Sequence, residues 1–141
     1  MRPLIRTLLV LLSSLNCWAS ADILVIVNPD SPLAATSKQL ISDIYLGRVR
    51  STASSERLLI LDQPRNSELR SRFFRQLNGM NLRNINAYWA RLEFSGDCQP
   101  PITMSDSASV INEVSNNRLA VGYVEAGALP PGVKTVLVLK E

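Results

Sequence analysis

Four short apolar segments of the chain have the pattern of buried β-strands. Each is a nearly continuous run of aliphatic residues, which is typical of a strand covered on both faces of its sheet. Proline, glycine, asparagine or aspartate lies near the ends of these runs, where such residues favour turns. The sequence therefore predicts strands at residues 22–28, 57–62, 119–124 and 133–139.

Four other segments carry apolar residues every three or four positions, which is the period of an amphipathic helix. Serine, threonine or aspartate stands at the start of three of them, where its side chain can cap the first turn. Gly47 and Gly79 follow the ends of two of them, as glycine often does. We predict helices from Thr36 or Ser37 to Leu46, from Ser67 to about Asn78, from Leu82 to about Phe94, and from Ser105 or Asp106 to Asn116.

Two longer stretches are predicted to be irregular. Residues 48–56 form a polar, serine-rich connection, and residues 95–103 form a loop in which Gly96, Pro100 and Pro101 oppose regular structure. Strands and helices otherwise alternate along the chain, which favours an α/β fold with a mixed, mostly covered sheet. The 141 residues are enough for one such domain, and we expect a single one over residues 22–141.

The first 21 residues have the pattern of an export signal rather than of a folded element. Arg2 and Arg6 precede a short apolar stretch at residues 8–15, and the sequence Ala-Ser-Ala at 19–21 is typical of a cleavage site. We predict cleavage after Ala21, which leaves 120 residues as a soluble protein of the bacterial periplasm. A lipoprotein signal at Cys17 is the weaker alternative, because the residue before such a cysteine is normally small.

The net charge argues against a nucleic-acid partner, whereas the distribution of charge allows an anionic ligand or an acidic partner. Removal of the signal lowers the 15 Lys+Arg residues to 13 against 12 Asp+Glu, a net charge of +1, so we expect no binding to nucleic acid. The charge is uneven, however, because residues 65–91 hold six arginines and one acid, Glu68. This segment is either a solvated helical face or a surface for an anionic ligand or acidic partner.

The residue inventory argues against an enzyme. The chain contains no histidine, which excludes Ser-His and Cys-His catalytic pairs and removes the commonest metal ligand. The aspartates do not have the spacing of a metal site, and we expect no metal and no cofactor. Cys98 would be the one cysteine left after signal cleavage, so it cannot form a disulfide within the chain.

The most informative segment runs from the second predicted strand into the second predicted helix. A strand that leads into a helix N-terminus presents free backbone N–H groups, which favour anions. We predict an oxyanion site on the polar turn between them, formed by Gln63, Arg65, Asn66, Ser67 and Arg70. Simpler roles remain open. Ser67 can be only a helix cap, Arg70 only a solvated surface residue, and Gln63 only a group that orients the turn.

Several segments together resemble the phosphate-binding proteins of ABC transporters, which have the type II periplasmic-binding fold. The residues that carry the resemblance are Val27–Asp30, Leu40–Arg48, Ser67 with Phe73-Phe74, and Ala120–Val124. Their order implies one lobe of that fold, a mixed sheet flanked by helices, and the resemblance extends over nearly all of residues 22–141. It implies a link to phosphate transport or sensing.

The chain departs from the family at the positions that would hold the anion. The family places an arginine just after the strand and Ser-Gly-Thr at the helix start, and it holds phosphate between two lobes. Here Asp62-Gln63 follows the strand, and Glu68 and Leu69 replace the glycine and the threonine. A carboxylate at position 68 would repel a bound anion, by about 1 kcal/mol in water at 4 Å.

Three hypotheses of function follow from this combination. The first is a periplasmic binding protein that holds phosphate or a related small oxyanion weakly at the turn. The second is a ligand-free interaction protein that docks on a membrane transporter, sensor or porin. The third is a homodimer in which a second copy builds the cleft that one lobe lacks.

Overall fold

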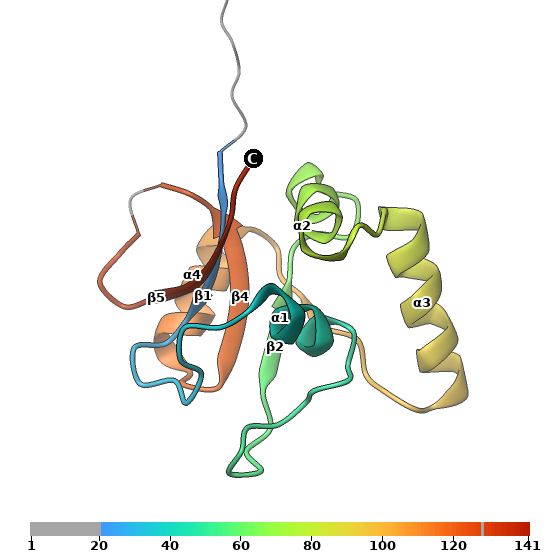
Figure 1. Cartoon of the computed structure of the whole chain (residues 1–141), viewed down its shortest axis with the longest axis horizontal. Helices are drawn as coiled ribbons and strands as arrows, with labels where there is room; N and C mark the ends of the chain where they lie inside the picture. The colour runs from blue at the N-terminus through green and yellow to red at the C-terminus, as the bar shows by residue number, and fades with distance from the viewer. Residues whose placement is uncertain (1–20, 128) are drawn as a thin grey trace, which may run out of the picture.

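The computed structural model describes residues 21–127 and 129–141, and it forms a five-stranded mixed sheet with helices on both faces (Figure 1). The predicted signal segment lies outside the described residues except for Ala21. The elements in chain order are β1 (Ile23–Val27), α1 (Lys38–Tyr45), β2 (Leu59–Asp62), α2 (Glu68–Asn78), α3 (Leu82–Ser95), β3 (Ile102–Thr103), α4 (Ser107–Asn116), β4 (Ala120–Glu125) and β5 (Lys134–Leu139).

The α/β fold and all eight predicted elements are confirmed, with ends that differ by a few residues. The predicted caps are also present. The side chains of Ser37, Ser67 and Asp106 each accept a hydrogen bond from the backbone N–H three residues ahead, as N-caps do. Gly79 ends α2 in the left-handed conformation, with φ of 74°.

The prediction of a loop throughout residues 95–103 was wrong at its end. Ile102 and Thr103 form the short edge strand β3, which pairs in parallel with Leu61 and Asp62. Pro100 and Pro101 lie just before the paired residues, so they do not remove a hydrogen bond of the ladder. Two residues are too few to give a periodic pattern in the sequence.

The strands lie in the order β3-β2-β4-β1-β5. β1 is antiparallel to both of its neighbours, whereas β2 runs parallel to β3 and β4. The C-terminal ends of β2 and β3 therefore lie side by side, together with the turns that follow them. This end of the two strands is where the sequence places its candidate anion site.

Each face of the sheet has its own apolar core. On one face, α4 packs Val110 and Val114 against Ile26, Leu61 and Val124. On the other face, α1, α2 and α3 cover a larger core that is rich in aromatic residues. In this core the rings of Phe73 and Tyr123 stack with their centroids 3.6 Å apart, and Tyr45, Phe73 and Phe74 meet edge to face. Figure 1 shows α3 at the periphery, on the side away from β5.

The arginine-rich segment is not a uniformly solvated face. Arg72 is buried, and its guanidinium donates to Glu125 of β4 at 2.5 Å, to Glu141 at 2.9 Å and to the carbonyl oxygen of Ala21. It thus ties α2 to both ends of the described chain. Arg70 is buried as well, and the other four arginines are exposed: Arg65, Arg75, Arg83 and Arg91.

Gly122 permits the close approach of α4 to the sheet. A Cβ at this position would lie 2.5 Å from Cγ1 of Val110. We expect Gly122→Ala to lower the free energy of unfolding by about 1–3 kcal/mol, because the core would be overpacked. Combining it with Val110→Ala removes the clash, so the double variant should be more stable than the sum of the two single losses predicts. Urea unfolding of the four proteins measures this coupling, and strict additivity would contradict it.

Candidate functional site

The end of β2 is organised around the carboxylate of Asp62, which is 4% exposed. Its Oδ1 accepts hydrogen bonds from the Tyr123 hydroxyl at 2.5 Å and from the backbone N–H of Gln63 at 2.9 Å. Its Oδ2 accepts one from Nε of Arg70 at 2.8 Å. A buried charge is tolerated only where it is paired and hydrogen-bonded, and this carboxylate has both kinds of partner.

Arg70 is part of this network and not a solvated surface residue. Besides the bond to Asp62, its Nη1 donates to the carbonyl oxygen of Arg65 at 3.0 Å and to Oδ1 of Asn86 at 2.8 Å. Its guanidinium carbon also lies 5.2 Å from the centre of the Phe74 ring, a cation–π distance. Arg70 thereby connects the turn, α2 and α3.

Gln63, which follows β2 directly, connects the end of this strand to β4 and to the start of α4. Its Nε2 donates to the carbonyl oxygen of Tyr123 at 2.9 Å and to the hydroxyl of Ser107 at 3.1 Å. These bonds join the end of β2 to β4 and to the start of α4. Both hydrogens of this amide are used, so Gln63 orients the turn, which is one of the roles left open for it.

The three remaining predicted residues differ in their surroundings. Ser67 is half-buried and its hydroxyl caps α2 by accepting from the N–H of Arg70 at 3.2 Å. Arg65 and Asn66 are exposed on the turn, and Glu68 is exposed at the first position of α2. The predicted cap is therefore confirmed, and the other side chains remain accessible to a ligand.

A small cavity of about 120 Å³ lies beside the turn. It brings together Arg65 and Arg70, whereas Gln63, Asn66 and Ser67 are not among the residues that line it. The walls are formed by Asp62, Arg65, Arg70, Asn86, Trp89, Ala90, Glu93, Pro100, Pro101 and Thr103. Two guanidinium groups and two carboxylates thus surround one small space.

Sequence reasoning missed the part of this wall that comes from α3 and β3. Asn86 and Glu93 are about two turns apart on α3, and Thr103 was assigned to a loop. Their positions 86, 93 and 103 form no motif with residues 62–70. Only the packing of α3 over the sheet edge brings them to the cavity.

Two buried tyrosines adjoin the network. The Tyr45 hydroxyl donates to the carbonyl oxygen of Leu61 at 2.8 Å. Burial raises the pKa of Tyr45 well above its ordinary value, and the Asp62 charge raises it further. Burial also raises the pKa of Tyr123, together with the charge of Asp62 and the hydrogen bond to it. Both hydroxyls therefore stay neutral and serve as hydrogen-bond donors.

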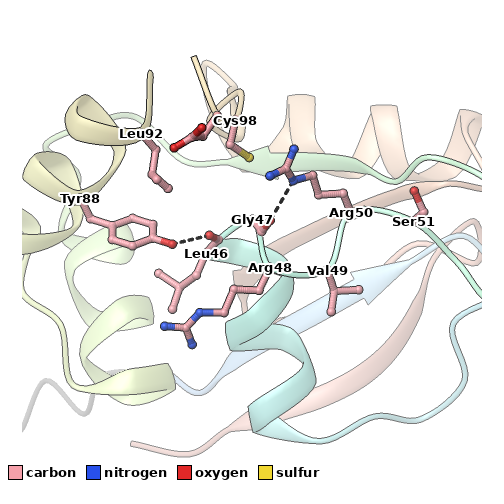
Figure 2. A pocket seen from close by; sticks show the side chains of 10 residues that line it. Leu46, Gly47, Arg48, Val49, Arg50, Ser51, Tyr88, Leu92 and Cys98 are labelled. Atoms are coloured by element: carbon pink, nitrogen blue, oxygen red, sulfur yellow. Dashed lines mark hydrogen bonds between the residues drawn. The ribbon is translucent and has the colours of Figure 1, made fainter. Parts of the chain in front are cut away.

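A wider depression of about 710 Å³ lies below α3, at the end of α1 (Figure 2). Figure 2 shows Arg50 donating to the carbonyl oxygen of Gly47, at 2.8 Å, and Tyr88 donating to that of Leu46, at 2.6 Å. Arg48 forms an exposed pair with Asp43. None of the predicted ligand residues lines this depression.

The described residues offer no site for a metal ion formed by three or more His, Cys, Asp or Glu side chains. Cys98 is a free, buried thiol. In residues 21–127 and 129–141, no helix has the length and apolar character needed to cross a bilayer.

Comparison with known proteins relates the chain to solved structures alone. No protein-family model and no curated protein sequence matches it. An ABC-type phosphate transport receptor from Vibrio cholerae superposes with a TM-score of 0.63 at 15% identity, covering 82% of this chain and 46% of the receptor. A putative phosphate ABC transporter substrate-binding protein with bound phosphate from Clostridium perfringens gives 0.64 at 16% identity, covering 82% and 45%.

The fold is that of one lobe of such a binding protein. A possible phosphate binding protein from Planctomyces limnophilus agrees, with a TM-score of 0.54 at 14% identity over 75% of this chain and 37% of that protein. The chain thus spans less than half the length of each of these three structures. All three are named as receptors or binding proteins, and the identities are low enough that the likeness establishes the fold alone.

The buried pair of Asp62 and Arg70 gives a stability prediction. Asp62→Asn leaves the Arg70 guanidinium buried without its charged partner, so we expect a loss of about 3 kcal/mol in the free energy of unfolding. Adding Arg70→Met should restore part of this loss, because no unpaired charge then remains. Chemical denaturation measures both effects. Glu56→Gln, which breaks the exposed pair of Glu56 with Arg118, is the matched control and should change stability little.

The two buried tyrosines give a prediction for alkaline pH. Their raised pKa values mean that, above about pH 10, the unfolded chain releases tyrosine protons that the folded chain retains. Stability should therefore be constant with respect to these groups below pH 10 and fall above it, by up to about 1.4 kcal/mol per pH unit for each tyrosine. Urea unfolding at pH 8 to 11 should show a smaller fall for Tyr45→Phe than for the original protein. An unchanged slope would contradict this cause.

Proposed function

We propose that the chain is an exported, periplasmic solute-binding-like protein that holds phosphate or a related small oxyanion weakly in the cavity beside the β2–α2 turn. The observation that carries this proposal is that Arg65 and Arg70, both predicted from the sequence as ligand residues, line one cavity. The fold supports it, because three structures of its kind are named as phosphate receptors or binding proteins.

The chemistry of the cavity suits a small anion with hydrogen-bonding oxygens. Arg65 is exposed and can turn its guanidinium towards a ligand, and such a bond to an anion is strong because it is charge-assisted. Asn86 and Thr103 add neutral polar groups to the wall. The first turn of α2 lies next to the cavity and contributes the positive end of the helix dipole.

The same geometry explains why we propose weak binding. Arg70 already neutralises Asp62, and Glu93 adds a second negative charge to the wall. An incoming anion therefore gains most of its attraction from Arg65. In addition, the described chain has no second lobe to close over the cavity, so water competes for each hydrogen bond.

One observation favours a second candidate, an interaction protein that docks on a membrane transporter, sensor or porin. Phe94, near the end of α3, is 95% exposed, and Ile102 of β3 is 50% exposed. An exposed apolar side chain of this size gains free energy when a partner buries it. In a homodimer, the third hypothesis, the partner would be a second copy that covers the open edge of the sheet.

Calorimetric titration with phosphate, sulfate and small carboxylates at millimolar concentration tests the binding proposal. We expect binding of phosphate that raises the melting temperature, by several degrees at a hundredfold excess over Kd. Arg65→Gln should weaken it by about tenfold without loss of stability, because Arg65 is exposed.

Arg75→Gln is the matched control, since Arg75 is an exposed arginine of α2 that does not line the cavity. It should bind as the original protein does. A folded protein that takes up none of these anions would contradict the binding proposal and favour the docking candidate.

A further inference from the structure

A second cavity, of about 300 Å³, lies between β2 and the segment that leads from α3 into β3. Its walls are mainly apolar, and the side chains that define its character are those of Leu58, Leu59, Ile60, Trp89, Pro100 and Ile102. Small-molecule sites in proteins begin at about this volume and are lined mostly by apolar and aromatic groups. The cavity is distinct from the polar one at the end of β2, although Trp89, Pro100 and Pro101 lie in the walls of both.

The charged groups of this cavity have one sign. Arg50 and Arg57 line it, and none of the described lining residues is acidic. Arg50 is held in place by the bond from its Nε to the carbonyl oxygen of Gly47, at 2.8 Å, and this bond leaves its terminal nitrogens for another acceptor. Arg57 is exposed.

Trp89, which lies in the walls of both cavities, has a hydrogen-bond donor without a partner among the described residues. The residue is 6% exposed, and within the described part of the chain its Nε1 has no hydrogen-bond partner. A buried N–H without a partner is uncommon and costs free energy.

The wall around Trp89 is closely packed and has little freedom to collapse. Gly47 adopts φ of +73°, and a Cβ there would lie 2.8 Å from both the Cys98 sulfur and the Trp89 ring. The turn after α1 can therefore follow this path only with glycine at position 47. The Trp89 ring and the Cys98 sulfur pack directly against this glycine.

We propose that this cavity binds a small amphipathic acid, with an aromatic ring or short alkyl chain between β2 and Trp89 and its single carboxylate at Arg50 and Arg57. The apolar walls provide the burial of the body of the ligand, and the two arginines provide charge complementarity for its head. A neutral molecule of the same shape lacks the charge that the two arginines attract. A small inorganic anion lacks the apolar body that the walls would bury.

Fluorescence and calorimetry with benzoate, benzyl alcohol and acetate test this assignment. All proteins carry Trp18→Phe, so that Trp89 is the only tryptophan whether or not the signal is removed. We expect benzoate to change Trp89 fluorescence and to bind at least about tenfold more tightly than benzyl alcohol or acetate. Absence of benzoate binding to the folded protein, or equal binding of benzyl alcohol, would overturn the proposal.

Variants locate the ligand and separate this site from the polar cavity. Arg57→Gln should weaken benzoate by about tenfold, and Ile102→Glu should also weaken it, because it places a carboxylate beside the bound one. Both positions are exposed, so thermal melts should show a folded protein.

Two further variants serve as controls. Arg65 and Arg75 do not line this cavity, so Arg65→Gln and Arg75→Gln should leave benzoate binding unchanged. Weakening by Arg65→Gln, with no effect of Arg57→Gln, would place benzoate in the polar cavity and refute the assignment. Because phosphate is tested at Arg65 and benzoate at Arg57, either proposal can fail while the other stands.

Discussion

The carboxylate of Asp62 is the group on which the arrangement of this molecule most depends. It lies at the end of β2, away from water, and its two oxygens accept from Tyr123, Arg70 and the backbone of Gln63. These partners belong to β4, to α2 and to the turn itself. A buried carboxylate cannot lose such partners without a large free-energy cost, so Asp62 helps to hold the start of α2 against the end of the sheet.

This use of Asp62 changes the chemistry expected of the helix start. A strand that leads into a capped helix is well suited to receive an external anion, and an unpaired Arg70 would have favoured one strongly. Here Arg70 is already paired with the Asp62 carboxylate of the protein itself. What remains for a ligand is the exposed Arg65, the neutral polar groups of the wall and the backbone of the turn. The site thus combines the shape of an anion site with a nearly neutral set of charges.

α3 contributes to the walls of two different cavities. It lies at the periphery of the fold, and its buried residue Trp89 separates a polar cavity at the end of β2 from an apolar one at the start of that strand. The walls of the two cavities differ because β2 itself changes from aliphatic residues to Asp62 along four positions. One helix therefore covers two spaces of opposite character, and ligands of different chemistry suit them.

The sequence by itself determined eight of the nine elements, with ends that lie within a few residues of those in the structure. Strands, helices and the caps at Ser37, Ser67 and Asp106 follow from local patterns, because the period of apolar residues and the hydrogen bonds of a cap involve neighbours in the chain. The importance of the β2–α2 turn was also visible, and two of its predicted residues do meet at one cavity.

Only the tertiary structure decided what those residues do. The pairing of β3 with β2, the capture of Arg70 by Asp62 and the approach of Asn86, Glu93 and Thr103 all join segments that are distant in sequence. No local period encodes such contacts, because they depend on which faces of the elements pack together. The same reason applies to Trp89, whose place between two cavities followed only from how α3 packs against the rest of the fold.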